Sequence, residues 1–87
     1  MAFEGECLIR RAGITPEGRV QLDLQAADKN PDGSPLFDWN WFLGRAELTQ
    51  QILAVALAAI TSNKRVAVQL DDPGASWSDV DRFLLVK

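Results

Sequence analysis

The sequence predicts a small α+β domain, mostly β, with the element order β-β-β-α-β-β. Residues 46–62 (AELTQQILAVALAAITS) form the one long stretch dominated by Ala, Leu and Gln, which favour helix. Val20, Leu22 and Leu24 alternate with polar residues, which is the two-residue period of a half-buried strand. Gly, Pro, Asn and Asp separate the other apolar runs, as expected where short strands are joined by turns.

The first two strands are expected to form an antiparallel hairpin. Phe3–Ala12 is a strand with imperfect alternation, and Arg19–Ala26 is the clearest strand in the chain. Thr15–Gly18 has Pro at its second position and Gly at its fourth, which is typical of a type I turn. Such a short connection can only join antiparallel neighbours.

The third strand is expected at Leu36–Leu43, after a polar loop at Asp28–Pro35 that contains a turn at Asn30–Gly33. Its alternation predicts two faces, one with Phe37, Trp39, Trp41 and Leu43 and the other with Leu36, Asp38, Asn40 and Phe42.

The helix carries more apolar surface than one sheet needs. Its large apolar side chains spread over an arc of roughly 200°, which is wider than the stripe of a helix on a single core. We resolve this arc into two seams. One seam packs on the sheet of the same chain, and the second faces outward and predicts self-association. The inner seam is Leu48, Ile52, Val55 and Ala59, and the outward seam is Leu53, Ala56, Leu57 and Ile60.

The chain after the helix supplies the last two strands. Asn63 is expected to cap the helix in the left-handed conformation, with basic residues 64 and 65 near the negative helix end. Arg65–Leu70 is the fourth strand, Asp71–Ser78 is a loop, and Val80–Val86 is the fifth strand.

Five strands with a helix between the third and fourth is the element order of an OB-like Greek-key barrel, here one domain over residues 1–87. An open antiparallel sheet with one packed helix has the same order and is the alternative. Residues 46–87, with ILAVALAAITSNKRVAVQL before a Trp-containing loop and an apolar strand, resemble the C-terminal half of pentamer-forming toxin B subunits of the pertussis or subtilase kind. The resemblance implies an OB barrel that oligomerises around its helix and binds glycans. The chain lacks the cysteine pair of that family, and no sugar-binding residue matches one for one.

Composition excludes several classes of chemistry. The chain is acidic, with 9 basic and 12 acidic residues and a net charge of −3, which disfavours nucleic acid as a partner. The absence of histidine excludes His-based triads, HExxH sites and ordinary zinc ligation, and a single cysteine excludes CxxC redox pairs and Cys-cluster metal sites. No dinucleotide or phosphate-binding glycine loop is present. We therefore expect no cofactor and no enzyme, although a small enzyme that uses paired carboxylates is an open alternative.

Three features of the sequence favour a cytoplasmic localisation. The longest apolar run, Ile52–Ile60, is too short to span a membrane. Residues Met1–Cys7 have no basic region of the kind that begins a secretory signal. Cys7 is the only cysteine, and we expect it to be a buried strand residue rather than a reactive thiol.

Tryptophans are the main candidates for ligand contact. Trp77 lies in a polar loop, and the same loop contains two acidic candidates, Asp71 and Asp72. Trp39 and Trp41 share a strand face, where aromatic rings either stack on sugars or bases or pack in a core or a subunit interface.

One segment matches half of a calcium loop. Asp28, Asn30 and Asp32 occupy its first, third and fifth positions, but the twelfth position is Trp39 instead of a bidentate Glu. The same residues are common in hairpin loops, and we expect no metal. The function expected from the sequence is a non-catalytic homo-oligomeric binding or structural module assembled through its helix. A barrel that binds glycan or single-stranded nucleic acid is the first alternative.

Overall fold

The computed structural model describes residues 2–86. It contains five strands and one helix, and the predicted order β-β-β-α-β-β is confirmed. The elements are β1 (Phe3–Ile14), β2 (Val20–Ala26), β3 (Asn40–Gly44), the short 3-10 helix η1 (Ala46–Leu48), α1 (Thr49–Ser62), β4 (Val66–Leu70) and β5 (Ser78–Leu85).

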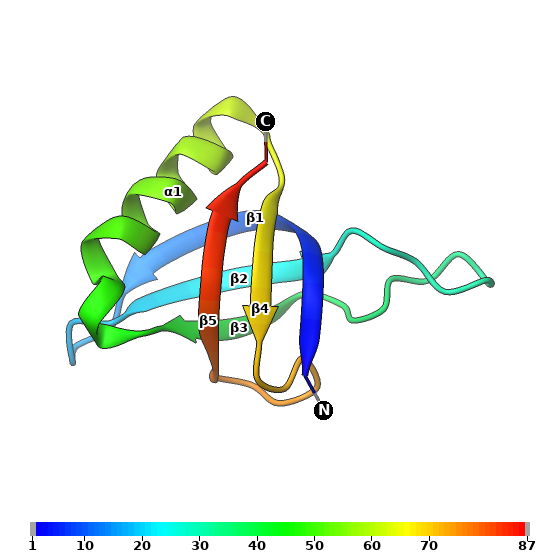
Figure 1. The fold of residues 1–87 in the computed structure, drawn as a ribbon, viewed down its shortest axis with the longest axis horizontal. Coiled ribbons are helices and arrows are strands. Elements are labelled where there is room, and N and C mark those ends of the chain that lie inside the picture. The colour runs from blue at the N-terminus through cyan, green and yellow to red at the C-terminus, as the bar shows by residue number, and fades with distance from the viewer. Residues whose placement is uncertain (1, 87) are drawn as a thin grey trace.

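The five strands close into a barrel in the order β1-β2-β3-β5-β4 (Figure 1). Closure depends on the long strand β1, whose first part pairs with β4 from Phe3 to Cys7 and whose second part pairs with β2 from Cys7 to Ile14. All neighbours are antiparallel except β3 and β5, which are parallel. The closed barrel confirms the prediction of an OB-like barrel and excludes the alternative of an open antiparallel sheet.

The barrel interior is filled by the inward-facing residues of all five strands. Cys7 belongs to this core, as expected, and burial raises the pKa of its thiol to about 12. A thiol with so high a pKa stays protonated and is a poor nucleophile. The fully or almost fully buried hydrophobic strand residues are Cys7, Val20, Leu22, Leu24, Ala26, Phe42, Val66, Val68, Leu70, Val80 and Phe83.

Helix α1 covers one end of the barrel, where it packs on β1 and β5 (Figure 1). Ile52 and Ala59 of the expected inner seam are buried. The prediction that Ala56 faces outward is wrong, because its side chain is fully buried. Ala56 follows Ile52 by four residues and precedes Ala59 by three, which places the three on one helical face. Leu57 and Ile60 of the outward seam are exposed, by 52% and 36%.

The third strand is shorter than predicted, since it begins at Asn40 instead of Leu36. The preceding residues belong to a long loop that projects from the barrel between β2 and β3 (Figure 1). Strand alternation does not hold in that loop, so Phe37 turns to the inner side and makes edge contacts with the rings of Phe3 and Phe42, at centroid distances of 5.1 and 5.6 Å. The prediction that Phe37 shares a face with Trp39 and Trp41 is therefore wrong.

Candidate functional site

A β-bulge in β1 places two consecutive arginines on the outer face of the barrel. Ile9 pairs with Leu24, but the next paired residue, Arg11, is opposite Asp23, so Arg10 is an extra residue in the strand. A bulge sets two residues of one strand against one residue of its neighbour. Arg10 and Arg11 both therefore reach Asp23, and the bulge accounts for the broken alternation of this segment.

Asp23 is the buried anchor of this face. Only 1% of the residue is exposed, and its Oδ2 accepts hydrogen bonds from Arg10 Nε at 2.6 Å and from Arg11 Nε and Nη2 at 3.0 and 2.9 Å. The arginine side chains themselves stay about half exposed. One carboxylate thus fixes two guanidinium groups and neutralises half of their charge.

Each arginine in turn covers a tryptophan ring. The guanidinium carbon of Arg10 lies 4.4 Å from the centroid of Trp39, and that of Arg11 lies 5.0 Å from the centroid of Trp41. Both distances are in the range of cation–π attraction. Trp41 pairs with Asp23 across β2 and β3, so the arginine, the carboxylate and the indole form a row over three strands.

Trp77 reaches the same face from the loop between β4 and β5. Its backbone N–H donates to the Trp41 carbonyl at 2.7 Å, and its ring stacks on the Trp41 ring with a centroid distance of 5.9 Å and an interplanar angle of 13°. Its φ is 65°, a left-handed conformation that costs a bulky residue about 1–3 kcal/mol. Trp77 is nevertheless 48% exposed. We name this group the Trp–Arg platform: Arg10, Arg11, Asp23, Trp39, Trp41 and Trp77.

Polar groups border the platform. The Asn40 side-chain oxygen accepts hydrogen bonds from Ser76 Oγ and from the Trp41 N–H, both at 3.0 Å. Asp38 accepts from the Trp39 N–H at 2.8 Å and from the Gln25 amide at 2.9 Å. The first of these bonds, aided by the second, holds the pKa of Asp38 below its usual range.

The two acidic candidates of the Trp77 loop make contacts away from the platform. A hydrogen bond to Asp81 raises the pKa of Asp71, while the pKa of Asp81 is lowered by Asp71 first and by Arg45 second. Asp72 accepts from the Gly74 N–H at 3.0 Å, an ordinary loop contact. These contacts give Asp71 and Asp72 a role in shaping the loop that presents Trp77.

The calcium-like segment is held by contacts within its own loop. Asp32 accepts from the backbone N–H and hydroxyl of Ser34 at 2.9 and 2.6 Å, and the Asn30 amide donates to the same hydroxyl at 3.2 Å. Asp28 lies towards β1, where its charge contributes to the raised pKa of Cys7. Within residues 2–86 no group of three or more His, Cys, Asp or Glu residues is placed to hold a metal ion.

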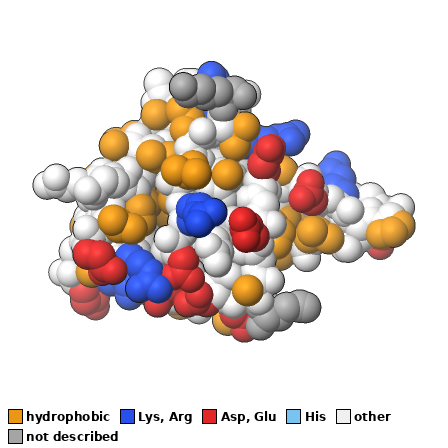
Figure 2. All heavy atoms as spheres, viewed as in Figure 1, with side chains coloured by type: hydrophobic (Ala, Val, Ile, Leu, Met, Phe, Trp, Pro, Cys, Tyr) orange, Lys and Arg blue, Asp and Glu red, His pale blue; other side chains and the backbone are white. Residues whose placement is uncertain are grey.

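The outward seam of α1 adjoins the end of β5. Figure 2 shows hydrophobic side chains gathered over the helix and this end of the strand. The exposed apolar residues of these two elements are Leu57 and Ile60 of α1 and Leu84 of β5, with exposures of 52%, 36% and 55%, and Leu53 of α1 is half-buried. The sequence Thr49–Ser62 contains no charged residue, so this face lacks ion pairs of its own.

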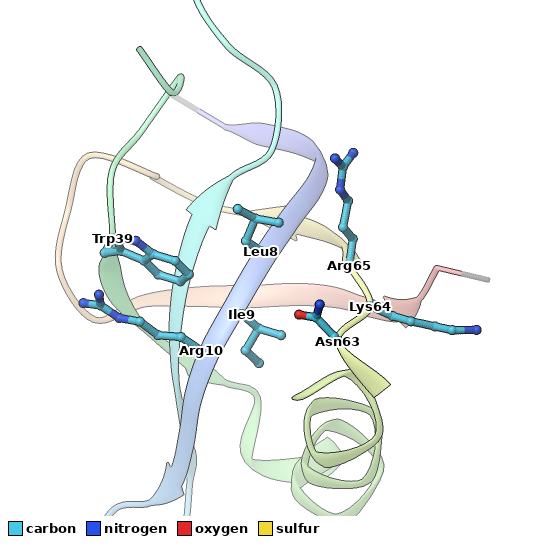
Figure 3. Close-up of a pocket in the computed structure, with 7 residues that line it drawn as sticks. All are labelled: Leu8, Ile9, Arg10, Trp39, Asn63, Lys64 and Arg65. Carbon is cyan, nitrogen blue, oxygen red and sulfur yellow. The ribbon is translucent and has the colours of Figure 1, made fainter. Parts of the chain in front are cut away.

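A cavity of about 380 Å³ lies beside the platform, between β1 and the connection from α1 to β4. Figure 3 shows Arg10 and Trp39 on one side, the residues that follow the helix on the other, and two apolar side chains between them. The cavity was not predicted, because its lining comes from three segments that are far apart in the sequence. Its lining residues are Leu8, Ile9, Arg10, Trp39, Asn63, Lys64 and Arg65.

Comparison with protein-family models, with curated proteins and with solved structures finds no match to this chain. The resemblance to toxin B subunits thus has no support beyond the barrel itself. Among residues 2–86 no helix is long and apolar enough to cross a membrane.

Proposed function

We propose that this chain is a non-catalytic binding module that holds a glycan on its Trp–Arg platform. The observation that supports this most strongly is Trp77, a large apolar ring kept 48% exposed in a left-handed backbone conformation. Residues held in such strained conformations cluster at ligand sites, because folding alone gains nothing from the strain. A half-exposed indole that is also fixed by a backbone hydrogen bond and a ring stack is prepared for a ligand before the ligand arrives.

The charge of the platform favours a sugar over a nucleic acid. Binding of single strands combines stacked bases with basic side chains that neutralise the phosphates. Here both arginines are already bonded to Asp23, and the whole chain has a net charge of −3. A pyranose ring requires no such neutralisation. It stacks its C–H groups on the electron-rich face of an indole, and its hydroxyls hydrogen-bond with amides and hydroxyls such as Asn40 and Ser76 at the border.

The position of the platform on the barrel is consistent with this proposal. It spans the outer face of β1, β2 and β3 and is completed by the β4–β5 loop. The outer face of strands two and three, together with the loop between strands four and five, is where OB barrels bind oligosaccharides and oligonucleotides.

Titration of tryptophan fluorescence tests the proposal. A panel of neutral and acidic oligosaccharides and single-stranded oligonucleotides is added to the wild-type chain, to Trp77→Ala and to a control, Leu84→Ala, which removes an equally exposed apolar side chain away from the platform. We expect saturable quenching by at least one glycan, a loss of affinity of tenfold or more in Trp77→Ala, and no change in Leu84→Ala. Emission unchanged by every glycan, or quenching by oligonucleotides alone with a steep dependence on salt, would overturn it.

Self-association through the outward seam of α1 is the second candidate. It is favoured by the uncharged, exposed surface of Leu57, Ile60 and Leu84. A stable interface buries about 800 Å² on each partner, whereas one face of a 14-residue helix offers about 200 Å². The helix alone therefore supports only weak association, and a stable oligomer requires β5 in the interface as well.

Analytical ultracentrifugation between 1 µM and 1 mM tests this second candidate. We expect association in the upper part of this range. The double variant Leu57→Ser with Ile60→Ser should weaken it so far that only monomer is seen up to 1 mM. A monomer at all concentrations, or association unaffected by the double variant, removes α1 as the contact.

A further inference from the structure

We propose that the cavity between β1 and the α1–β4 connection binds the carboxylate or phosphate of an organic anion with a small, ring-sized apolar body. The proposal deepens the function proposed above, because Arg10 and Trp39 belong both to the platform and to the cavity. The platform then holds one unit of the ligand, and the cavity selects an acidic group on it.

The charge of the cavity lining is the first argument. The seven lining residues include no carboxylate and three basic side chains, of which Arg10 is already bonded to Asp23, so Lys64 and Arg65 supply the charge that an anion would meet. Arg65 Nη1 donates a hydrogen bond to Glu6 Oε1 at 3.4 Å, and both side chains of this ion pair are about half exposed. Lys64 makes no ion pair within residues 2–86. On a chain with a net charge of −3, this concentration of positive charge around one hollow favours an anion there.

The shape of the cavity is the second argument. Its volume of about 380 Å³ lies near the lower end of the range of small-molecule pockets, which suits one ring and its substituent. Leu8 and Ile9 form an apolar surface between the two polar sides, and Trp39 adds an aromatic wall (Figure 3). A free inorganic ion would leave this apolar surface unused, so we assign the cavity to an anion with a hydrophobic body.

Asn63 supplies a neutral donor at a fixed place. Its left-handed backbone, with φ 55° and ψ 45°, ends α1 and sets the side-chain amide on the cavity side, with the oxygen nearer to Ile9 and the nitrogen nearer to Arg65 (Figure 3). The backbone N–H groups of Asn63 and Lys64 donate to the Ile60 and Ala59 carbonyls at 3.3 and 2.9 Å. These bonds satisfy two carbonyls at the negative end of the helix. Without a hydrogen-bond donor, the same carbonyls would repel a bound anion.

In Figure 3 the Lys64 side chain extends away from Trp39, and the Arg65 side chain stands at the rim. Long, exposed basic side chains are free to reorient, so both are within reach of an anion seated against Leu8 and Ile9. The stem of Arg10 lines the cavity, while its guanidinium, held by Asp23 and placed over Trp39, points away from Ile9 (Figure 3), so Lys64 and Arg65 are the cations that would meet the anion.

NMR titration of the ¹⁵N-labelled chain tests the proposal with four probes that separate its parts. Benzoate and phenyl phosphate combine a ring with a carboxylate or a phosphate, benzyl alcohol has the ring without charge, and inorganic phosphate has the charge without the ring. We expect benzoate or phenyl phosphate to shift the Asn63 side-chain amide and the Trp39 indole N–H in a saturable way at millimolar concentration. Benzyl alcohol and inorganic phosphate should bind at least tenfold more weakly, and the stronger of the first two probes identifies the acidic group.

Two double variants, compared with each other, and one single variant localise the binding. Lys64→Gln with Arg65→Gln should weaken binding of the better probe at least tenfold. Lys29→Gln with Arg82→Gln removes the same two charges outside the cavity and should leave affinity within twofold. Asn63→Gly keeps the left-handed backbone but deletes the amide, and should weaken binding about threefold to tenfold with no loss of thermal stability.

Equal affinity for benzyl alcohol, equal losses in the two charge pairs, or no shift of the cavity resonances at 20 mM probe would overturn the proposal. Failure here is distinct from failure of the proposed function. If neutral glycans quench Trp77 and no anion shifts Asn63, the platform is a ligand site and the cavity is not. If an anion shifts Asn63 and no glycan quenches Trp77, the cavity is a ligand site and the platform is not.

Discussion

Two surfaces of this barrel expose large apolar side chains, and they differ in what holds those side chains in place. Trp77 on the platform is 48% exposed and Leu57 on α1 is 52% exposed. Trp77 is fixed by a backbone hydrogen bond to Trp41 and by a ring stack, and its neighbours Trp39 and Trp41 lie under guanidinium groups. Leu57 projects from a regular helix that contains no charged residue. Two side chains of similar exposure thus lie on different kinds of surface. Trp77 is held in one position by its neighbours, whereas Leu57 is not.

This difference indicates different partners. A ligand that meets fixed rings loses less free energy to the ordering of side chains, so fixed aromatic groups suit a small, directional ligand. Burial of aliphatic groups has no preferred direction and grows with area, so a plain apolar face suits another protein surface. Substitutions on the two surfaces should therefore differ in their effects, and the largest effect is expected at Asp23.

Asp23→Ala is expected to destabilise the fold by about 2 kcal/mol. Breaking a buried ion pair costs about 3–5 kcal/mol, and the half-exposed arginines reduce this figure because water screens them once the carboxylate is gone. Urea unfolding followed by tryptophan emission measures the change, and the emission of the folded state should also change as Arg10 and Arg11 leave the indole faces.

The control for Asp23→Ala is Glu4→Ala, also on the outside of the barrel. Glu4 is 3.9 Å from Arg82, and both side chains are well exposed, so we expect no measurable change in stability. Equal effects of the two substitutions would mean that Asp23 does not anchor the platform.

Trp77→Gly is expected to be more stable than Trp77→Ala by about 1 kcal/mol. Both variants lose the stack on Trp41, but glycine adopts a φ of 65° freely, whereas alanine keeps a left-handed strain of about 1–2 kcal/mol. Urea unfolding of the two variants measures the difference. At an ordinary strand or loop position alanine is the more stable of the two, so a result in that direction would show that Trp77 is not strained and would remove the main support for the platform as a ligand site.

Most of the fold was predictable from the sequence because local signals agreed with one another. Val20, Leu22 and Leu24 point into the barrel as their alternation predicts, and Asn63 ends the helix in the expected left-handed conformation. The errors arose where tertiary packing overrides the local pattern. Phe37 leaves the strand alternation because it belongs to a loop that folds back onto Phe42.

The candidate site was predictable only in part. The three tryptophans were identified, but nothing local shows that Trp77 stacks on Trp41, a residue thirty-six positions earlier. The convergence of Arg10 and Arg11 on one face was not predictable from strand alternation, because two adjacent charges in a strand ordinarily face opposite sides. The broken alternation around Arg10 was the available signal, since a bulge is what turns both side chains to one face.

Leu57→Ser combined with Ile60→Ser is expected to leave the stability of the monomer within about 0.5 kcal/mol of the wild type. Both side chains face solvent, and the helix is held by Ile52, Ala56 and Ala59 on the opposite side. Urea unfolding at 2 µM, below the range of association, measures this. A loss above 1 kcal/mol would mean that the outward seam supports the fold itself, and the contrast with the platform would lose its basis.

Asp71→Asn is expected to give the smallest effect, and one that depends on pH. The hydrogen bond to Asp81 raises the pKa of Asp71, so its contribution to stability is complete below the ordinary carboxyl pKa near 4 and disappears as pH rises and Asp71 ionises. Above that pH the ionised pair repels, whereas asparagine still donates a hydrogen bond to Asp81. Asp71→Asn should thus raise the melting temperature at pH 7 and leave it unchanged at pH 3.5. The control is Glu17→Gln in the β1–β2 turn, which removes one charge and should not show this dependence of the melting temperature on pH.

Asp81 itself has a lowered pKa and keeps its bond from Arg45 Nε, at 2.7 Å, in both the wild type and Asp71→Asn, so it contributes equally to each. An equal shift at both pH values would mean that the two carboxylates do not share a proton, and the loop that presents Trp77 would then be held by its backbone contacts alone.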